Sequence, residues 1–235
     1  RDVEDPSIYV RFPVDGEDDT YFLVWTTTPW TLPANLLLAV HDDIDYAYIE
    51  TDGQTLILAE ALLDDVMRDV DYSVVKRCKG AELVGMRYAR LFDFFEVDGD
   101  AFRVVSADFV STESGTGIVH TAPAYGVDDL ALGQQHGLPV IHAVGRDGLF
   151  LPEVEPVAGM FFKDADKPLI RLLKERGLMF RSERYLHSYP FGWRTGDPII
   201  YYAKNAWYIR TSEYRERMVE LNQTIKWVPE TIRDG

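Results

Sequence analysis

Short runs of β-branched and aromatic residues dominate the hydrophobic pattern of this 235-residue chain. Such runs, bounded by Gly, Pro, Asn or Asp, are typical of β-strands. Asp52-Gly53 lies between two of the runs and predicts a tight hairpin turn. The predicted strands are Ile8–Phe12, Tyr21–Trp25, Tyr46–Glu50, Thr55–Ala59, Phe102–Val110, Gly117–Thr121 and Ile199–Ala203.

Helical signals are less frequent than strand signals. Apolar residues at helical spacing predict a helix at Ala59–Arg68. An acidic start, an Asp-Lys-Pro opening and possible Thr or Ser caps predict the helices at Val127–His136, Asp166–Arg176 and Thr211–Asn222, respectively. Two of these segments are followed by a glycine, the residue that commonly follows the last turn of a helix. Because the helices are scattered among the strands without regular alternation, we expect an α+β fold. Its centre should be a β-barrel-like core with flanking helices, not a doubly wound sheet.

The character of the chain changes near Phe180. The net charge is −15, yet ten of the 24 Lys and Arg and only five of the 39 Asp and Glu lie between Arg171 and Arg217. We therefore expect a core domain at 1–180 and a basic, aromatic tail at 181–235. Such a tail could contact a phosphate backbone. The solvated faces of ordinary helices would give the same mixture of charges.

Several classes of protein are excluded by composition. No apolar run is long enough to span a bilayer, and the first residues do not resemble a signal peptide. The single cysteine, Cys78, can form neither an internal disulfide nor a multi-cysteine zinc site. This usage favours a reducing compartment, so we expect a cytoplasmic protein without a membrane partner. The chain begins without Met, and we expect it to be a piece of a longer polypeptide.

The first unusual motif runs from Trp25 to Asn35 and reads WTTTPWTLPAN. Prolines remove backbone donors, and hydroxyl groups compete with strand hydrogen bonds, so this peptide is a poor core element. In an extended chain Thr26 and Thr28 share one side, and Thr27 lies opposite unless the chain turns. Hydroxyl groups can position a water or stabilise an oxyanion. The plainer explanation is a strand edge that ends at a proline turn.

The second motif runs from Gly115 to Asp129 and reads GTGIVHTAPAYGVDD. The two leading glycines indicate a tight turn or a close backbone approach. His120 near a strand end could be a base, a ligand or a wall, although a lone histidine is more often structural. Asp128 and Asp129 open a predicted helix. The ordinary explanations are an N-cap for Asp128 and a helix-dipole interaction for Asp129, whereas the functional one is a carboxylate aimed at a cation.

An aromatic and basic segment, HSYPFGWR, spans 187–194. Aromatic rings stack on unpaired bases and Arg binds phosphates, so this segment could contact RNA. The alternative is a packed hairpin with a proline turn. If the segment does contact RNA, the candidate residues are His187, Tyr189 and Arg194.

Both motifs resemble the signature peptides of the editing domain of isoleucyl-tRNA synthetases, also called connective polypeptide 1. The resemblance covers nearly the whole chain and continues through the segment YLHSYP to WVPE at 227–230. It implies a β-barrel-centred fold that hydrolyses valine wrongly attached to the isoleucine tRNA, with valyl-adenylate as a further substrate that the resemblance allows. The partners implied are the tRNA 3′ end carrying valine and the Rossmann catalytic domain of the same polypeptide.

The resemblance also implies roles for single residues. Asp129 matches the aspartate that binds the α-ammonium group of the substrate, and His120 matches the histidine that excludes isoleucine by bulk. The ester and the terminal adenosine would be surrounded by Thr27, Thr28 and Trp30, with support from Thr26, Thr31 and Asn35. Asp129, Thr27 and Thr28 are the candidate catalytic residues. A covalent nucleophile is not required, because the ester is labile and orientation of a water can suffice.

The chain departs from many relatives in its tail, where Gly192 and Thr195 replace two cysteines. We therefore expect the zinc site of those relatives to be absent. ATP motifs are also lacking, so we expect no cofactor in this fragment and ATP use by the absent catalytic domain. Two alternatives stay open. One is a non-catalytic tRNA-binding domain; the other is a valyl- or leucyl-type editing domain, against which Thr28-Pro29-Trp30 argues because those families carry an Arg in this peptide.

Overall fold

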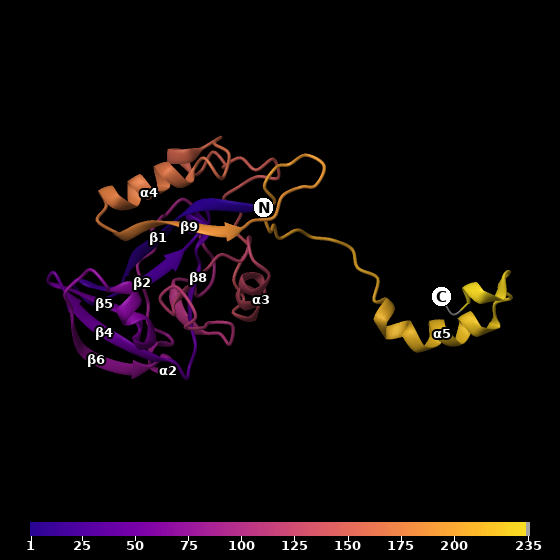
Figure 1. Cartoon of the computed structure of the whole chain (residues 1–235), viewed down its shortest axis with the longest axis horizontal. Helices are drawn as coiled ribbons and strands as arrows, with labels where there is room; N and C mark the ends of the chain where they lie inside the picture. The colour runs from indigo at the N-terminus through magenta and orange to yellow at the C-terminus, as the bar shows by residue number, and fades with distance from the viewer. Residues whose placement is uncertain (234–235) are drawn as a thin grey trace. The chain divides into compact units, whose positions relative to one another are not determined.

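A long first strand organises the larger of two sheets (Figure 1). In the computed structural model, which describes residues 1–233, β1 (Asp2–Pro13) pairs antiparallel with both β2 (Thr20–Thr26) and β9 (Met179–Ser188). Alternate residues Ile8, Val10 and Phe12 are fully buried, as expected for a strand with one face on the core. The strand thus joins the N-terminal threonine-rich region to the C-terminal part of the core.

The larger sheet contains six strands in the order β6-β4-β5-β2-β1-β9. Only the pairing of β2 with β5 is parallel. The remaining strands are β4 (Asp45–Thr51), β5 (Gln54–Ala59) and β6 (Ser73–Lys79). Among the described residues, no ladder joins β6 to β9, so the sheet is open. The α+β class is confirmed, whereas the closed form of the expected barrel-like core is not found.

The predicted hairpin turn at Asp52-Gly53 is confirmed. It joins β4 to β5, which pair antiparallel up to Thr51 and Gln54. Both turn residues have positive φ, 48° for Asp52 and 75° for Gly53. A two-residue turn of this kind matches the twist of the strands, and Asp-Gly is among the few pairs that adopt it easily.

The smaller sheet contains part of the second motif, Gly115–Asp129. β3 (Leu37–Val40) lies between β7 (Arg103–Ser106), which is parallel to it, and β8 (Val119–Thr121), which is antiparallel. β8 also contacts β2 of the larger sheet. Both predicted strands in this region are shorter than expected. Phe102 and Gly117 have positive φ, which interrupts an extended chain at the start of each.

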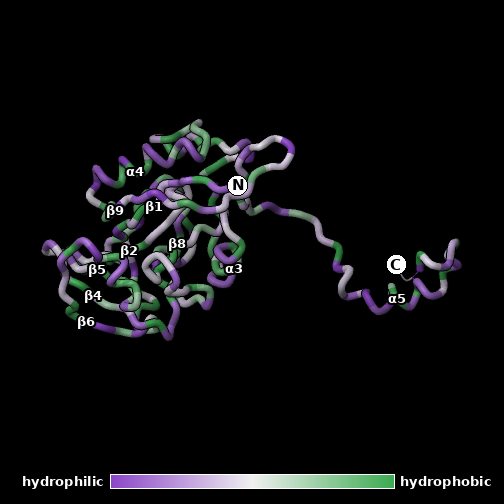
Figure 2. The backbone as a smooth tube through the Cα atoms, viewed as in Figure 1, coloured by the Kyte–Doolittle hydropathy of each residue, from purple (hydrophilic) through white to green (hydrophobic). Residues whose placement is uncertain are grey.

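Two helices match their predicted segments closely, α3 (Val127–Gln135) and α4 (Asp166–Glu175). α4 lies over β1 and β9 (Figure 1) and alternates between apolar and polar colour along its length (Figure 2). The predicted Ala59–Arg68 helix is instead the end of β5, then η2 (Glu60–Leu62) and α1 (Leu63–Val66). A further short helix, α2 (Gly80–Leu83), follows β6.

Three strands were not predicted, and one predicted strand is wrong. β3, β6 and β9 are absent from the sequence-based prediction. β9 was not predicted because it is an edge strand, and its charged residues obscure the alternation of apolar and polar positions. No strand forms at Ile199–Ala203; Ile199 N–H and Ala203 N–H donate instead to the carbonyls of Pro190 and Ala124.

The first compact unit covers Arg1–Ala203 and the second Lys204–Gly235. The expected change at residue 180 therefore falls inside β9, which belongs to the first unit because it pairs with β1 along its length. The second unit contains η4 (Thr211–Tyr214), α5 (Arg215–Thr224) and η5 (Glu230–Ile232). Among the described residues, no helix is long and apolar enough to cross a membrane.

A buried hydrogen bond joins α4 to η1 (Pro29–Ala34), the 3₁₀-helix within the threonine-rich motif. The Trp30 N–H donates to Asp166 Oδ1 at 3.0 Å, and Asp166 is only 3% exposed. Burial disfavours the charged carboxylate and raises the pKa of Asp166 to about 7, against the opposing effects of Lys163 and the Trp30 N–H. The first turn of η1 thus depends on a side chain 136 residues away.

The Asp166→Asn variant should become more stable than the wild type as pH rises. An unfolded aspartate ionises near pH 3.8 and the folded one near 7, so the wild type loses stability between these values. Asn keeps an acceptor for Trp30 but does not ionise. We expect its advantage in unfolding free energy to be about 2–3 kcal/mol larger at pH 8 than at pH 5, measured by urea unfolding.

Asp164→Asn is the matched control, because it removes the same charge from an exposed position two residues earlier. An Asp166→Asn advantage that is equal at both pH values would contradict the raised pKa.

Candidate active site

One cavity of about 320 Å³ contains most of the residues singled out in both motifs. Its wall comes from the end of β2 and the turn into η1, from the loop before β8, from β8 itself and from the start of α3. All of these elements lie in the first unit. The lining residues are Trp25, Thr26, Thr27, Thr28, Thr31, Phe109, Ser111, Ser114, Gly115, Thr116, Gly117, Ile118, Val119, His120, Ala122, Tyr125 and Asp129.

The threonine hydroxyls form a connected row. Thr26 Oγ1 accepts the Thr28 N–H at 3.1 Å and lies 3.3 Å from Thr28 Oγ1, which in turn lies 3.3 Å from Thr31 Oγ1. The shared side of Thr26 and Thr28 is therefore confirmed. The chain turns at Thr28, where extended structure ends (φ −128°, ψ 67°), and Thr27 lines the cavity as well.

His120 is nearly buried, at 9% exposure, and both of its ring nitrogens are hydrogen-bonded. Nε2 lies 2.7 Å from Thr31 Oγ1 and Nδ1 lies 3.1 Å from Asn35 Nδ2. Burial lowers the pKa of His120 to about 4, because the charged imidazolium is poorly solvated there. The ring is therefore neutral at physiological pH.

The direction of these bonds decides what His120 can do. An amide NH₂ only donates, so Nδ1 accepts from Asn35, and in a neutral ring Nε2 then carries the proton and donates to Thr31. Thr31 Oγ1 in turn donates to the Thr28 carbonyl at 2.8 Å. His120 has no free nitrogen to take a proton and does not activate the Thr31 hydroxyl. It forms a neutral, fixed wall of the cavity.

Asp129 supplies a carboxylate to the cavity. It lies in the first turn of α3, and its Oδ1 accepts the Ala122 N–H at 2.7 Å. Burial raises its pKa, while the Ala122 N–H acts in the opposite direction. A Cβ at Gly126 would lie 2.1 Å from Asp129 Oδ2, so only glycine leaves room for the carboxylate in this position.

The two aspartates at the start of α3 have different surroundings. Gly126 is the N-cap, so the predicted N-cap role of Asp128 is wrong. Asp128 is exposed, whereas Asp129 is half-buried and faces the cavity. The functional interpretation of Asp129 thus has a geometric basis that its neighbour lacks.

The glycine-rich loop confirms the predicted close approach. Gly115 and Gly117 both have positive φ. A Cβ on Gly117 would lie 2.4 Å from the Ala59 Cβ, and one on Gly115 would lie 3.1 Å from the Trp25 ring. The loop backbone therefore lies close against β5 and β2, and it forms one side of the cavity.

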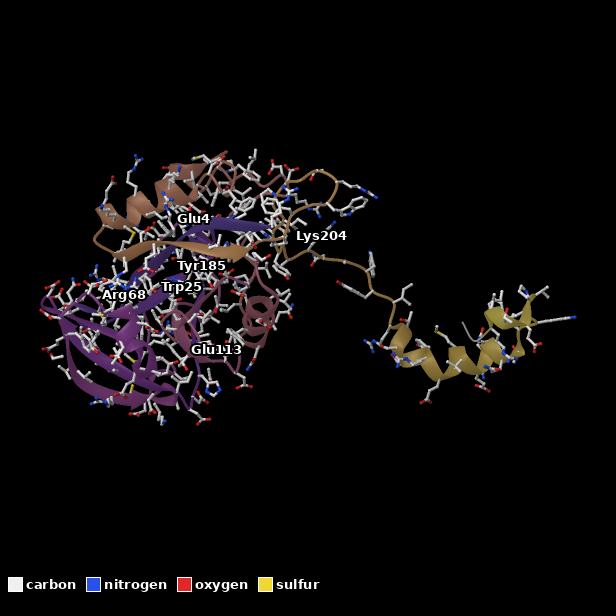
Figure 3. All side chains as sticks on the ribbon, in the orientation of Figure 1. Glu4, Trp25, Arg68, Glu113, Tyr185 and Lys204 are labelled. Atoms are coloured by element: carbon white, nitrogen blue, oxygen red, sulfur yellow. The ribbon has the colours of Figure 1, made fainter. Side chains whose placement is uncertain are left out.

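Some lining residues were missed by sequence reasoning. Phe109 falls within the predicted strand Phe102–Val110 but lies in the loop after β7, while Ser111 and Ser114 follow in the same loop, and no motif marked any of the three. Trp25 and Tyr125 lie inside the quoted motifs but were not assigned a role. Trp25 meets Tyr185 of β9 edge to face, with ring centroids 5.3 Å apart (Figure 3). Tyr125 is held by its hydroxyl, which accepts the N–H groups of Ala143 and Val144.

Two candidate residues of the first motif do not line the cavity. Trp30 is 4% exposed and packs edge to face on Tyr125 and Phe162, at centroid distances of 5.0 and 4.9 Å. It supports Tyr125 from behind. Asn35 reaches the cavity only through its bond to His120.

The tail candidates lie outside the cavity. His187 Nε2 bonds to Asp5 Oδ2 at 2.9 Å, and the Tyr189 ring lies 3.9 Å from Lys163 Nζ. Arg194 stacks on its neighbour Trp193, which is exposed. Within residues 1–233, no three His, Cys, Asp or Glu side chains are grouped as metal ligands.

The cavity therefore combines a row of neutral hydroxyls, a neutral imidazole wall and one carboxylate. The carboxylate can accept hydrogen bonds from a cationic group, and the hydroxyls can donate to an oxygen or orient a water. The lining does not contain a nucleophile paired with a base in the required direction, since His120 donates to Thr31. Such a site suits chemistry that depends on orientation.

No protein-family model matches the chain. Whole proteins do match it closely. It is 46% identical over all 235 residues to the isoleucine–tRNA ligase of Clostridium acetobutylicum, and 42% identical over 235 residues to that of Picrophilus torridus. The chain is covered completely in both cases but spans only 22% and 23% of the two ligases.

Solved structures of leucyl-tRNA synthetase domains have a similar fold. The crystal structure of GlLeuRS-CP1 matches with a TM-score of 0.60 at 14% identity, covering 75% of this chain and 98% of its own. The editing domain of the P. knowlesi cytosolic leucyl-tRNA synthetase matches with a TM-score of 0.55 at 13% identity, covering 78% and 96%. The chain therefore corresponds over its whole length to a segment of isoleucine–tRNA ligases, and it has the fold of leucyl-tRNA synthetase editing domains.

Proposed function

We propose that this chain hydrolyses the ester between a wrong amino acid, valine, and the 3′ end of the isoleucine tRNA. The observation that carries the proposal is the placement of Asp129 in the same cavity as the threonine row and the neutral His120 wall. An aminoacyl ester presents an ammonium group, a carbonyl and an apolar side chain. The three parts of the cavity complement these three groups.

Asp129 is assigned to the α-ammonium group. Its Oδ1 is occupied by the Ala122 N–H, which fixes the carboxylate, while the side chain still faces the cavity. A partly buried carboxylate attracts a cation more strongly than an exposed one, because less water screens the pair. This contact would anchor the amino acid and orient its carbonyl.

The threonine hydroxyls are assigned to the ester. Thr27 and Thr28 can donate to the carbonyl oxygen or hold the attacking water, whose oxygen bonds to the carbonyl carbon as the ester C–O bond breaks. The attacking water loses a proton and the departing ribose oxygen gains one. The neighbouring ribose hydroxyl is the candidate relay, because it can accept the proton of the water while it donates its own to the departing oxygen. His120 does not serve as base, because both of its nitrogens are engaged.

Valine is the substrate that such a domain must remove. A synthetic site made for isoleucine cannot strongly reject the smaller valine, and this pair is the standard example of that limit. A second pocket that admits valine and excludes isoleucine by the bulk of His120 provides the missing selection. ATP use belongs in this proposal to the Rossmann catalytic domain of the longer polypeptide, which with the tRNA is the proposed partner.

Asp129→Asn should abolish recognition of the ammonium group. Removing one partner of a partly buried ion pair is strongly destabilising, so the dissociation constant of a non-hydrolysable valyl-adenosine analogue should rise ~100-fold or more. Calorimetric titration of the analogue measures this without tRNA. Asp128→Asn, at the exposed neighbour, should bind like the wild type. Equal binding of the analogue by both variants would contradict the assignment of Asp129 to the ammonium group.

Gly126→Ala should impair hydrolysis while leaving stability nearly unchanged. Gly126 has an extended backbone that alanine adopts freely, so the new methyl group acts by displacing the Asp129 carboxylate. We expect valyl-tRNA deacylation to fall by roughly 10-fold or more while the urea midpoint is maintained. Gly137→Ala, where no atom lies within 4 Å of the new methyl group but φ is +66°, should show the reverse pattern.

His120→Ala should let isoleucine into the pocket. Discrimination between valyl and isoleucyl esters on the same tRNA should fall by roughly 10–100-fold, in line with the cost of accommodating one methylene. Deacylation of both esters by the chain measures the ratio, and His136→Ala serves as control because His136 is outside the cavity lining. If the ratio did not change, another group would have to form the wall.

A further inference from the structure

Behind His120 lies a tyrosine that neither motif contains. Tyr88 is 3% exposed, and its ring packs edge to face on Phe12 and Phe102, with centroids 5.3 and 6.3 Å away. Its backbone N–H donates to the Phe102 carbonyl at 3.1 Å. The ring is therefore held on several sides by the core, and its hydroxyl has a defined position.

The hydroxyl of Tyr88 points at the amide of Asn35. It donates to Asn35 Oδ1 at 2.7 Å, in a buried environment. Burial raises the pKa of Tyr88 well above 10, so the hydroxyl keeps its proton and remains a donor. Asn35 Oδ1 thus receives a short hydrogen bond from a hydroxyl that the surrounding core holds in place.

The other end of the Asn35 amide is fixed by acceptors. Its Nδ2 donates to the Leu37 carbonyl at 2.9 Å and to His120 Nδ1 at 3.1 Å. A carbonyl oxygen cannot donate, so the Leu37 carbonyl favours the orientation with Nδ2 on its side. The donor at Oδ1 and the carbonyl at Nδ2 select the same amide orientation, and that orientation requires His120 Nδ1 to be without a proton.

The bonds therefore run in one direction, from Tyr88 through Asn35 and His120 to Thr31 and finally to the Thr28 carbonyl. Buried hydrogen bonds in series polarise and strengthen one another. Without the Tyr88 hydroxyl, Asn35 Oδ1 would be a buried acceptor that lacks this donor. An amide turned by 180° would offer Oδ1 to His120, move the ring proton to Nδ1 and make Nε2 an acceptor, so that His120 would no longer donate to Thr31.

We propose that Tyr88 is a positioning residue that acts through Asn35 to hold His120 as the Nε2-protonated tautomer. This assignment rests on the proposed function for its effect on substrate choice, since a fixed imidazole is what limits the size of the pocket. The tautomer itself is a property of the protein without substrate. It can therefore be tested separately.

The first test is the ¹⁵N spectrum of the histidine ring in the wild-type chain, with His120 assigned by comparison with His120→Ala. We expect a protonated Nε2 and an unprotonated, hydrogen-bonded Nδ1 at pH 7. A proton on Nδ1 would overturn the proposal, whatever happens to any variant.

The second test compares Tyr88→Phe with Tyr48→Phe. The first substitution keeps the packed ring and removes only the hydroxyl. The second removes a hydroxyl that contacts Met86 Sδ at 3.7 Å and has no link to His120. We expect Tyr88→Phe, but not Tyr48→Phe, to show a mixture of His120 tautomers. Unchanged His120 signals in a folded Tyr88→Phe chain would overturn the proposal.

Substrate choice gives a third, separate measurement. In Tyr88→Phe the rate ratio of valyl to isoleucyl deacylation should fall by about 10-fold, mainly because isoleucyl hydrolysis increases. A changed tautomer with an unchanged ratio would overturn the role in selection. A wild-type chain that hydrolyses neither ester would refute the proposed function, and the spectra would still decide the assignment of Tyr88.

Discussion

The structure of the cavity depends on one constraint: both ring nitrogens of the buried His120 require hydrogen-bond partners. An uncompensated polar group in the core is costly, so His120 requires a donor on one side and an acceptor on the other. Asn35 and Thr31 provide them from a segment more than 80 residues earlier. The β3–β8 pairing, with Leu38 opposite His120, brings the two motifs into this contact. The threonine row faces the cavity as a consequence.

Charge is kept apart from this neutral network. Asp129 is held by the Ala122 N–H, and its carboxylate occupies the space that Gly126 leaves by lacking a side chain. The buried Asp166 lies behind η1, where it serves the Trp30 N–H and not the cavity. The site therefore has one charged corner and a neutral wall, a pattern that suits a ligand with an ammonium group beside an apolar side chain.

Local sequence signals predicted the elements whose stability is local. Asp52-Gly53 suits its turn by backbone preference, and the helices at 127–135 and 166–175 follow from their acidic or Asp-Lys-Pro openings and the glycines after them. β9 was missed because an edge strand pairs on one side only and tolerates charge on both faces. Trp30 was expected to surround the ester, yet its ring packs against Tyr125 and Phe162, which the local motif did not reveal.

The amino-acid sequence was enough to identify the two motifs, the α+β class and the resemblance to an editing domain, because these depend on residue type and spacing. It could not reveal that His120 donates to Thr31, that Gly126 leaves room for Asp129 or that Tyr88 stands behind Asn35. Those facts depend on which donors and acceptors meet across long sequence separations. Only the folded chain decides that, since a buried hydrogen bond acquires its direction from partners that the sequence places far apart.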